Sequence, residues 1–380
     1  MSTVNGMNDR RIKTLVVDDS LLSRRLLSQL LAEDAGIEVV ATASNGREAL
    51  DAVALHNPDV ITMDVEMPEM NGIEALRRIM AETPIPVVML SAYTEHDAEL
   101  TFQALDLGAV DFVTKPHPIL SRRLADIRDE IVLKVKTASR IRVVKMDPGR
   151  TSPASGAPVP RPSRARLKTA PPLTKCRRVV SIGVSTGGPQ CLRQLLPAIP
   201  PDFPAAIVIV QHMPIGFTKA LADRLNGMSQ IEVKEAETGD VLREGRAIIA
   251  RGDHHLVIRE DAFAYTTLLN RENPVSRFRP SIDVMMESTS RVFGPRNVGV
   301  IMTGMCEDGV RGVQIIHDRG GRVIAQDRST SAVFGMNRAA IESGCVDRVV
   351  TLHGIVPAMI EFLEESGRRI RPRPKSAKPE

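Results

Sequence analysis

The chain has 380 residues, of which 43% are hydrophobic and 25% charged, as is typical of globular proteins. At roughly 100–200 residues per domain, this length favours two domains. The net charge is only +4, no apolar run approaches the roughly 18 residues of a membrane helix, and the first residues lack the apolar core of a signal peptide. The cysteines have no paired spacing, which argues against a disulfide framework or zinc ribbon and favours a cytoplasmic protein.

Residues 12–133 alternate apolar runs with amphipathic stretches. Strands are expected at TLVV (14–17), IEVVATA (37–43), DVITM (59–63), PVVML (86–90) and AVDFV (109–113). Strands that alternate with helices predict βαβ units and a parallel sheet with helices on its faces. The pattern therefore predicts a first α/β domain of five βα units over residues 10–135.

Acidic, hydroxyl and basic side chains follow four of these expected strands. The first strand leads into Asp18 and Asp19, the third into Asp64, the fourth into Ser91 and the last into Lys115. In an open parallel sheet the carboxyl ends of the strands form one edge, where ligands bind. Three carboxylates there would repel one another unless a divalent cation such as Mg²⁺ bridges them. A lysine and a hydroxyl beside them can neutralise the oxygens of a phosphoryl group, so the set indicates a phosphorylation site.

The motifs VVDDS, MDVEMPEMNG, MLSA and TKP resemble the receiver domain of two-component response regulators, which has a flavodoxin-like (βα)5 fold. The resemblance implies that Asp64 accepts the phosphoryl group and that Ser91 and Lys115 contact it. It also implies a Mg²⁺ site formed by Asp18, Asp19, Asp64 and the backbone carbonyl of Glu66.

Two segments are basic and proline-rich, and lack apolar periodicity. They are residues 136–177, which we expect to be a linker, and residues 369–380, which we expect to be a tail. Clustered Lys and Arg can bind nucleic acid or a membrane surface. Because aromatic residues are almost absent and no nucleic-acid motif adjoins either segment, we expect a tether, with neither nucleic-acid binding nor membrane insertion.

Strand patterns resume in the expected second domain, residues 178–368. The apolar runs are VVSIGV (179–184), AAIVIVQ (205–211), NVGVIMT (297–303), GRVIAQ (321–326) and DRVV (347–350). Residues 231–268 are richer still in strand-like segments. The pattern predicts a doubly wound, mostly parallel α/β domain with an antiparallel β insertion.

The stretch SIGVSTGGP places Ser185 between glycines, after an apolar strand and before a helix-compatible segment. This context fits a nucleophile elbow. A serine needs a base and an acid that orients the base. His212 follows the next strong strand and Asp308 follows another, so all three are expected at one sheet edge. The alternative is that the glycine turn cradles a phosphate while His212 and Asp308 are structural.

The motifs IGVSTGGP, QHMP, FRPSIDVMMES, MTGMCEDG and AQDRSTSAVFGM resemble the chemotaxis protein-glutamate methylesterases, the CheB family. The resemblance implies Ser185 as nucleophile, His212 as general base and Asp308 as the orienting acid, with Thr186 and Met305 around the oxyanion site. It also implies glutamine deamidation, methyl-accepting chemoreceptors as substrates, a CheA-type histidine kinase as phosphodonor, and no cofactor for the ester chemistry. Cys306 and Asn337 depart from the family pattern, which has glycine and proline at these positions.

Two other classes of function compete with an esterase. One is a response regulator whose second domain binds a partner without catalysis. The other is a DNA-binding regulator that uses the basic linker, but no helix-turn-helix pattern follows the first domain.

Overall fold

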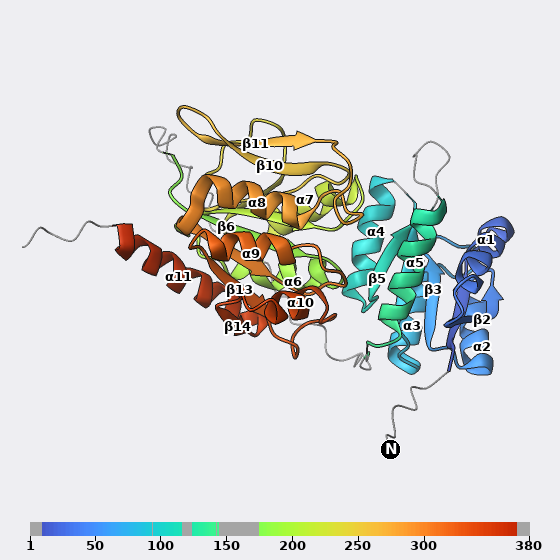
Figure 1. The fold of residues 1–380 in the computed structure, drawn as a ribbon. Helices are drawn as coiled ribbons and strands as arrows, with labels where there is room; N and C mark the ends of the chain where they lie inside the picture. The colour runs from blue at the N-terminus through green and yellow to red at the C-terminus, as the bar shows by residue number, and fades with distance from the viewer. Residues whose placement is uncertain (1–9, 93, 116–123, 142, 144–174, 371–380) are drawn as a thin grey trace, which may run out of the picture. The chain divides into compact units, whose positions relative to one another are not determined.

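The computed structural model describes residues 10–92, 94–115, 124–141, 143 and 175–370 (Figure 1). The chain divides into two compact units, residues 1–164 and 165–380. Most of the expected linker and tail lies outside the described residues. Within the described part of the chain, no helix is both long enough and apolar enough to cross a membrane.

The first unit is a parallel sheet of five strands, as predicted, and the structure places them in the order β2-β1-β3-β4-β5 (Figure 1). Its strands are β1 (Ile12–Val17), β2 (Ile37–Ala43), β3 (Val60–Asp64), β4 (Val87–Ser91) and β5 (Asp111–Thr114). Its helices are α1 (Leu21–Ala32), α2 (Gly46–His56), α3 (Gly72–Glu82), α4 (Glu95–Asp106) and α5 (Leu124–Ala138).

The helices of the first unit begin at polar caps and bury apolar faces against the sheet. Four of them start after residues whose side-chain oxygens accept the backbone N–H three positions on, namely Ser20, Asn45, Asn71 and Thr94. Helices α1 and α5 pack together on one face, where Leu27, Leu31 and Ile131 join a buried cluster with the strands. This packing fixes the strand ends that carry the acidic residues.

The second unit contains a parallel sheet of seven strands in the order β14-β13-β12-β6-β7-β9-β8. These strands are β6 (Val179–Val184), β7 (Ala206–Gln211), β8 (Glu232–Glu235), β9 (Arg246–Ile249), β12 (Asn297–Ile301), β13 (Arg322–Gln326) and β14 (Arg348–Val350). Its α-helices are α6 (Gly188–Leu195), α7 (Phe217–Met228), α8 (Ile282–Phe293), α9 (Val310–Asp318), α10 (Met336–Glu342) and α11 (Ile355–Ile370). Short 3-10 helices occupy Leu196–Ala198, Gly294–Arg296 and Leu352–Gly354.

The strands of the β-rich segment, residues 231–268, belong to two different sheets. Its first two strands, β8 and β9, extend the parallel sheet. Only β10 (His255–Glu260) and β11 (Tyr265–Asn270) pair antiparallel, as a separate hairpin. The predicted antiparallel insertion is therefore confirmed, and it is confined to this hairpin.

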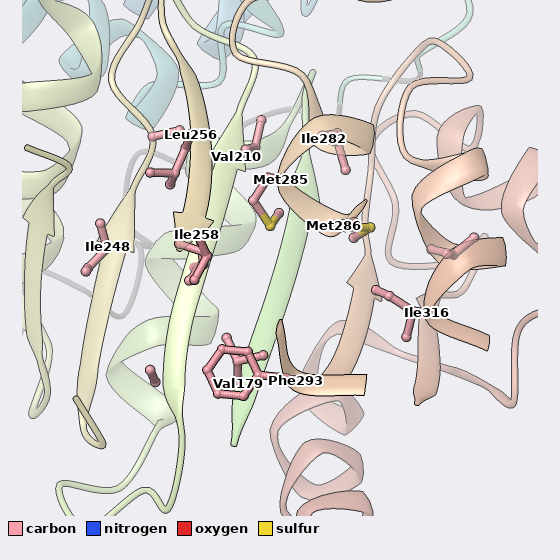
Figure 2. Packing of buried hydrophobic residues seen from close by; sticks show 14 of the residues in the cluster. Val179, Val210, Ile248, Leu256, Ile258, Ile282, Met285, Met286, Phe293 and Ile316 are labelled. Atoms are coloured by element: carbon pink, nitrogen blue, oxygen red, sulfur yellow. The ribbon is translucent and has the colours of Figure 1, made fainter. Parts of the chain in front are cut away.

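The hairpin and helix α8 enclose the main core of the second unit. Met285 of α8 lies beside Val210 of β7, Met286 lies toward Ile316 of α9, and Phe293 lies beside the start of β6 (Figure 2). The strands here are buried on both faces, which explains their unbroken apolar runs. Buried polar residues such as Gln211 and Gln326 lie where the strands β7 and β13 end.

Candidate functional site

The acidic residues of the first unit meet at the carboxyl edge of its sheet. Val17 of β1 pairs with Met63 of β3, so the residues that follow, Asp18 and Asp64, are neighbours. Asp18, Asp19 and Asp64 each offer a carboxylate oxygen, and these oxygens lie within 4.8 Å of one another. Such a group of oxygen donors fits a hard divalent cation.

Lys115 lies against this acidic group. Its Nζ is 2.8 Å from Asp18 Oδ2 and also forms an ion pair with Asp64. Burial raises the pKa of Asp64 to about 6; Lys115 opposes this rise, while the charges of Asp18 and Asp19 add to it. Among the described residues, the three carboxylates therefore carry more negative charge than Lys115 neutralises, which favours a bound cation.

Ser91 is fully buried at the end of β4, where its Oγ accepts a 2.8 Å hydrogen bond from Thr101. Glu66 is exposed in the loop after β3, and the role of its carbonyl as a metal ligand stays a prediction.

The glycine of the MNG motif, Gly72, is required by its surroundings, because a Cβ there would come within 1.9 Å of the Asp64 carbonyl oxygen. Only glycine lets α3 start this close to the strand end.

In the second unit, Ser185 and His212 follow two paired strands. Val184 of β6 is the register partner of Gln211 of β7, so the next residues lie side by side at the carboxyl edge. Gln211 Nε2 donates to the carbonyl oxygens of both Ser185 and His212, each at 3.0 Å, and ties the two strand ends together. Gly187 turns the chain into α6 with a φ of 77°. The predicted strand–turn–helix context of Ser185 is thus present.

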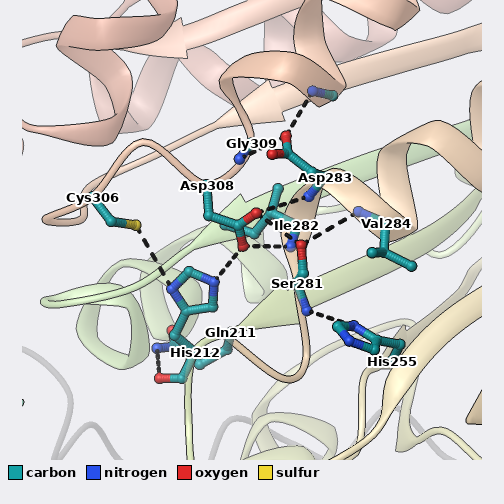
Figure 3. A network of polar contacts seen from close by, with 11 residues as sticks. Gln211, His212, His255, Ser281, Ile282, Asp283, Val284, Cys306, Asp308 and Gly309 are labelled. Atoms are coloured by element: carbon teal, nitrogen blue, oxygen red, sulfur yellow. Dashed lines mark hydrogen bonds and ion pairs between the residues drawn. The ribbon is translucent and has the colours of Figure 1, made fainter. Parts of the chain in front are cut away.

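Asp308 is buried and lies against His212 (Figure 3). His212 Nε2 is 2.8 Å from Asp308 Oδ2. The start of α8 supplies three more donors: the Ser281 hydroxyl at 2.8 Å and the backbone N–H groups of Ile282 at 2.7 Å and Asp283 at 3.2 Å. The carboxylate therefore occupies the N-terminus of a helix, where negative charge is stabilised.

These contacts determine the charge of Asp308 and the tautomer of His212. Burial alone would raise the pKa of Asp308, but the hydrogen bond and charge of His212, with the α8 donors, lower it below its ordinary value. An ionised carboxylate only accepts hydrogen bonds, so Nε2 of His212 carries its hydrogen. The lone pair available for proton abstraction is on Nδ1.

Cys306 lies next to that nitrogen, with its Sγ 4.0 Å from His212 Nδ1. Burial raises the pKa of the Cys306 thiol to about 12, so the group is a neutral thiol rather than a thiolate at neutral pH. Within the described residues, Ser185 Oγ makes no hydrogen bond to the imidazole. Apo geometries of this kind often tighten only when substrate binds.

Sequence reasoning missed the residues that hold Asp308. Ser281 is the N-cap of α8, and its backbone N–H donates to His255 Nδ1 at 3.3 Å. Asp283 in the first turn of α8 accepts from the backbone N–H groups of Gly309 at 2.9 Å and Gly312 at 2.7 Å, at the start of α9. A serine followed by Asp before an apolar helix signals a cap, but not what else the cap binds.

We expect Asp283→Asn to remove part of the pH dependence of stability. Burial, together with the charge of Asp308, raises the pKa of Asp283 to about 6, above its ordinary value of 3.8. The folded chain therefore binds an extra proton between these values, and stability falls as pH rises through that window. The variant keeps the accepting oxygen without the charge. Between pH 4.5 and pH 7, the free energy of unfolding of the variant should rise relative to that of the parent by on the order of 1–2 kcal/mol. Urea unfolding followed by circular dichroism measures this difference. Parallel pH profiles for the two proteins would contradict this account.

The remaining predicted residues surround Ser185. Thr186 is buried directly after it, and its carbonyl accepts from Thr303 Oγ1 at 2.9 Å. Met305 follows Gly304, at which an added Cβ would come within 2.8 Å of Ser185 Cβ. Their roles in an oxyanion site stay predictions. Asn337 is buried in the first turn of α10, where its side chain donates to the Gln326 carbonyl at 2.9 Å and to Ser331 Oγ at 2.7 Å, so it ties this helix to the end of β13.

A receiver-like sheet with an acidic pocket, joined to a parallel α/β unit with serine, histidine and aspartate at its edge, defines a response regulator with an enzyme-like second unit. Residues 14–124 match the response regulator receiver domain, and residues 180–359 match the CheB methylesterase family. The chain belongs to the CheB methylesterase family.

Relatives match over almost the whole chain. The protein-glutamate methylesterase/protein-glutamine glutaminase of Pyrococcus horikoshii is 44% identical over 355 residues, covering 93% of this chain and 94% of that protein. The Geobacillus kaustophilus protein of the same name is 45% identical, covering 94% of this chain and 100% of that protein. The second unit is also similar to the Thermotoga maritima CheB methylesterase catalytic domain, whose crystal structure is known. The two sequences are 40% identical, and the match covers 49% of this chain and 98% of the Thermotoga maritima domain with a TM-score of 0.48.

Proposed function

We propose that this chain hydrolyses glutamate γ-methyl esters on methyl-accepting chemoreceptors and deamidates receptor glutamines, and that phosphorylation of Asp64 activates it. The observation that carries the proposal is the His212–Asp308 pair at 2.8 Å, one strand away from Ser185. Membership of the family, and relatives named for both activities, support hydrolysis over a second unit that only binds a partner.

In the proposed reaction, His212 Nδ1 takes the proton of Ser185 as Oγ attacks the ester carbonyl. Asp308 keeps the hydrogen on Nε2 and stabilises the imidazolium that forms. Backbone donors near Thr186 and Met305 stabilise the oxyanion. His212 then returns the proton to the departing methanol, which leaves a glutamyl ester on Ser185. Water, deprotonated by His212, releases free glutamate; with a glutamine substrate, ammonia leaves in place of methanol.

In the first unit, Asp64 is the proposed phosphoacceptor, with a CheA-type histidine kinase as phosphodonor. Asp18, Asp19, Asp64 and the Glu66 carbonyl would hold Mg²⁺, which neutralises charge on the phosphoryl group when bound. Lys115, already paired with Asp18 and Asp64, is placed to rotate onto a phosphoryl oxygen. The hydroxyl of Ser91 would donate a hydrogen bond to a second phosphoryl oxygen.

The test is methanol release from methylated chemoreceptor membranes, with and without Mg²⁺ and a small phosphodonor such as phosphoramidate. We expect the phosphodonor to raise the rate about 5- to 100-fold, the usual range of coupling between two sites. Asp64→Asn should lose the stimulation, because it removes the acceptor oxygen, and keep the basal rate, because it leaves Ser185, His212 and Asp308 of the second unit unchanged. Stimulation that survives in Asp64→Asn would assign phosphorylation elsewhere, and no release under any condition would contradict the esterase.

A further inference from the structure

A strained turn lies beside the site of the second unit. Val275 and Phe278 exchange two backbone hydrogen bonds, of 3.2 and 2.9 Å. The residues between them, Ser276 and Arg277, both have positive φ, of 50° and 72°. Two consecutive left-handed residues are typical of a type I′ turn, which usually contains Asn and Gly. With serine and arginine, this turn is kept at a conformational cost.

The turn presents Phe278 to His212. The two rings are stacked, with centroids 4.0 Å apart and planes inclined by 5°. Phe278 is only half-buried and lies outside the buried core cluster of this unit. Filling the core therefore does not explain its position.

The chain is also anchored directly after this phenylalanine. Arg279 Nε lies 3.0 Å from Asp253 Oδ1, and Nη1 donates to the carbonyl oxygens of Arg271 and Glu272 at 3.2 and 3.1 Å. The aromatic ring is thus held between a strained turn and an arginine anchor. Such restraint on both sides leaves the ring little freedom to leave the imidazole.

We propose that Phe278 is a positioning residue for His212, an inference that rests on the proposed function. Asp308 holds His212 at one atom, Nε2, and this contact alone leaves the imidazole free to swing about the hydrogen bond. A flat ring against the imidazole face fixes its plane, so that Nδ1 keeps one direction at the strand edge where Ser185 lies. The aromatic face also stabilises the imidazolium that forms when His212 accepts the serine proton.

Kinetics of the full-length chain test this role. Phe278→Leu keeps apolar bulk and loses the flat face, so kcat for methanol release should fall about 3- to 30-fold while KM changes less than about twofold. Phe278→Tyr should restore kcat to within about twofold, because it restores the stack. Phe263→Leu, the same chemical change at an exposed position between β10 and β11, is the matched control and should keep kcat. A parental kcat in Phe278→Leu would overturn the proposal.

A second readout does not depend on activity. In proton spectra of histidine-labelled protein, the ring signals of His212, assigned with His212→Gln, should be shifted upfield by the stacked ring. Phe278→Leu should remove this shift and Phe278→Tyr should keep it. Unchanged signals in Phe278→Leu would show that the stack is absent and overturn the proposal. No methanol release from the parent chain would instead overturn the proposed function, and the positioning role with it, whatever the ring signals show.

Discussion

Ser185→Ala should lower phosphodonor-stimulated methanol release by about a thousandfold or more. The substitution removes the atom that attacks the ester carbonyl in the proposed mechanism and leaves the His212–Asp308 pair intact. Ser185 is buried, but it loses only a hydroxyl that makes no hydrogen bond to His212, so the fold should survive. The measurement is methanol released from methylated receptor membranes, with circular dichroism to confirm folding.

Cys306→Ala is the matched control for this experiment. The Cys306 thiol lies 4.0 Å from His212 Nδ1, the nitrogen proposed to take the serine proton, so its position makes it the competing nucleophile. Because burial raises the pKa of this thiol to about 12, we expect the alanine variant to keep most of the activity. Loss of release in Cys306→Ala, with retention in Ser185→Ala, would reverse the assignment of the nucleophile.

Asp308→Asn should lower kcat by about a hundred- to ten-thousandfold and also destabilise the second unit. Both oxygens of Asp308 are used: Oδ2 accepts from His212 and Ile282, and Oδ1 accepts from Ser281 and Asp283. An asparagine supplies only one accepting oxygen, so one pair of donors loses its partner whichever way the amide is turned. We expect a loss of about 1–3 kcal/mol in the free energy of unfolding.

Urea unfolding and methanol release on the same samples check both parts of this prediction. Asp318→Asn, the same chemical change at an exposed position of α9, should alter neither quantity. Asp308→Asn with parental kcat would show that the acid does not set the tautomer of His212. Full activity loss without destabilisation would mean that the α8 donors find other partners.

Strand patterns were sufficient to predict where most side chains of the two candidate sites lie. Asp64, Ser185 and His212 each come at or directly after a buried strand, and parallel pairing then brings strand ends together without further information. The same reasoning predicted both sheets. It was less specific for β8 and β9, because strands of only four residues carry no mark of parallel or antiparallel pairing.

The surroundings of Asp308 could not be predicted in this way. Its partners Ser281, Ile282 and Asp283 lie about 26 residues earlier in the chain, on a helix whose placement depends on packing against the sheet. Which imidazole nitrogen faces the acid is likewise a matter of rotamer and ring orientation. Phe278 opens the motif FRPSIDVMMES, but an aromatic residue in a polar loop has no periodicity that could indicate its contact with His212.

Helices α8 and α9 are joined at their first turns by two carboxylates, each of which accepts hydrogen bonds from the other helix. Asp308, just before α9, accepts hydrogen bonds at the start of α8, and Asp283 of α8 accepts them at the start of α9. Neither helix can slide along the other without breaking both sets of bonds. Catalytic competence and the packing of this helix pair are therefore lost together, so heat should inactivate the enzyme as soon as the two helices separate. The esterase activity that remains after heating therefore reports how much of the protein still has α8 and α9 in contact.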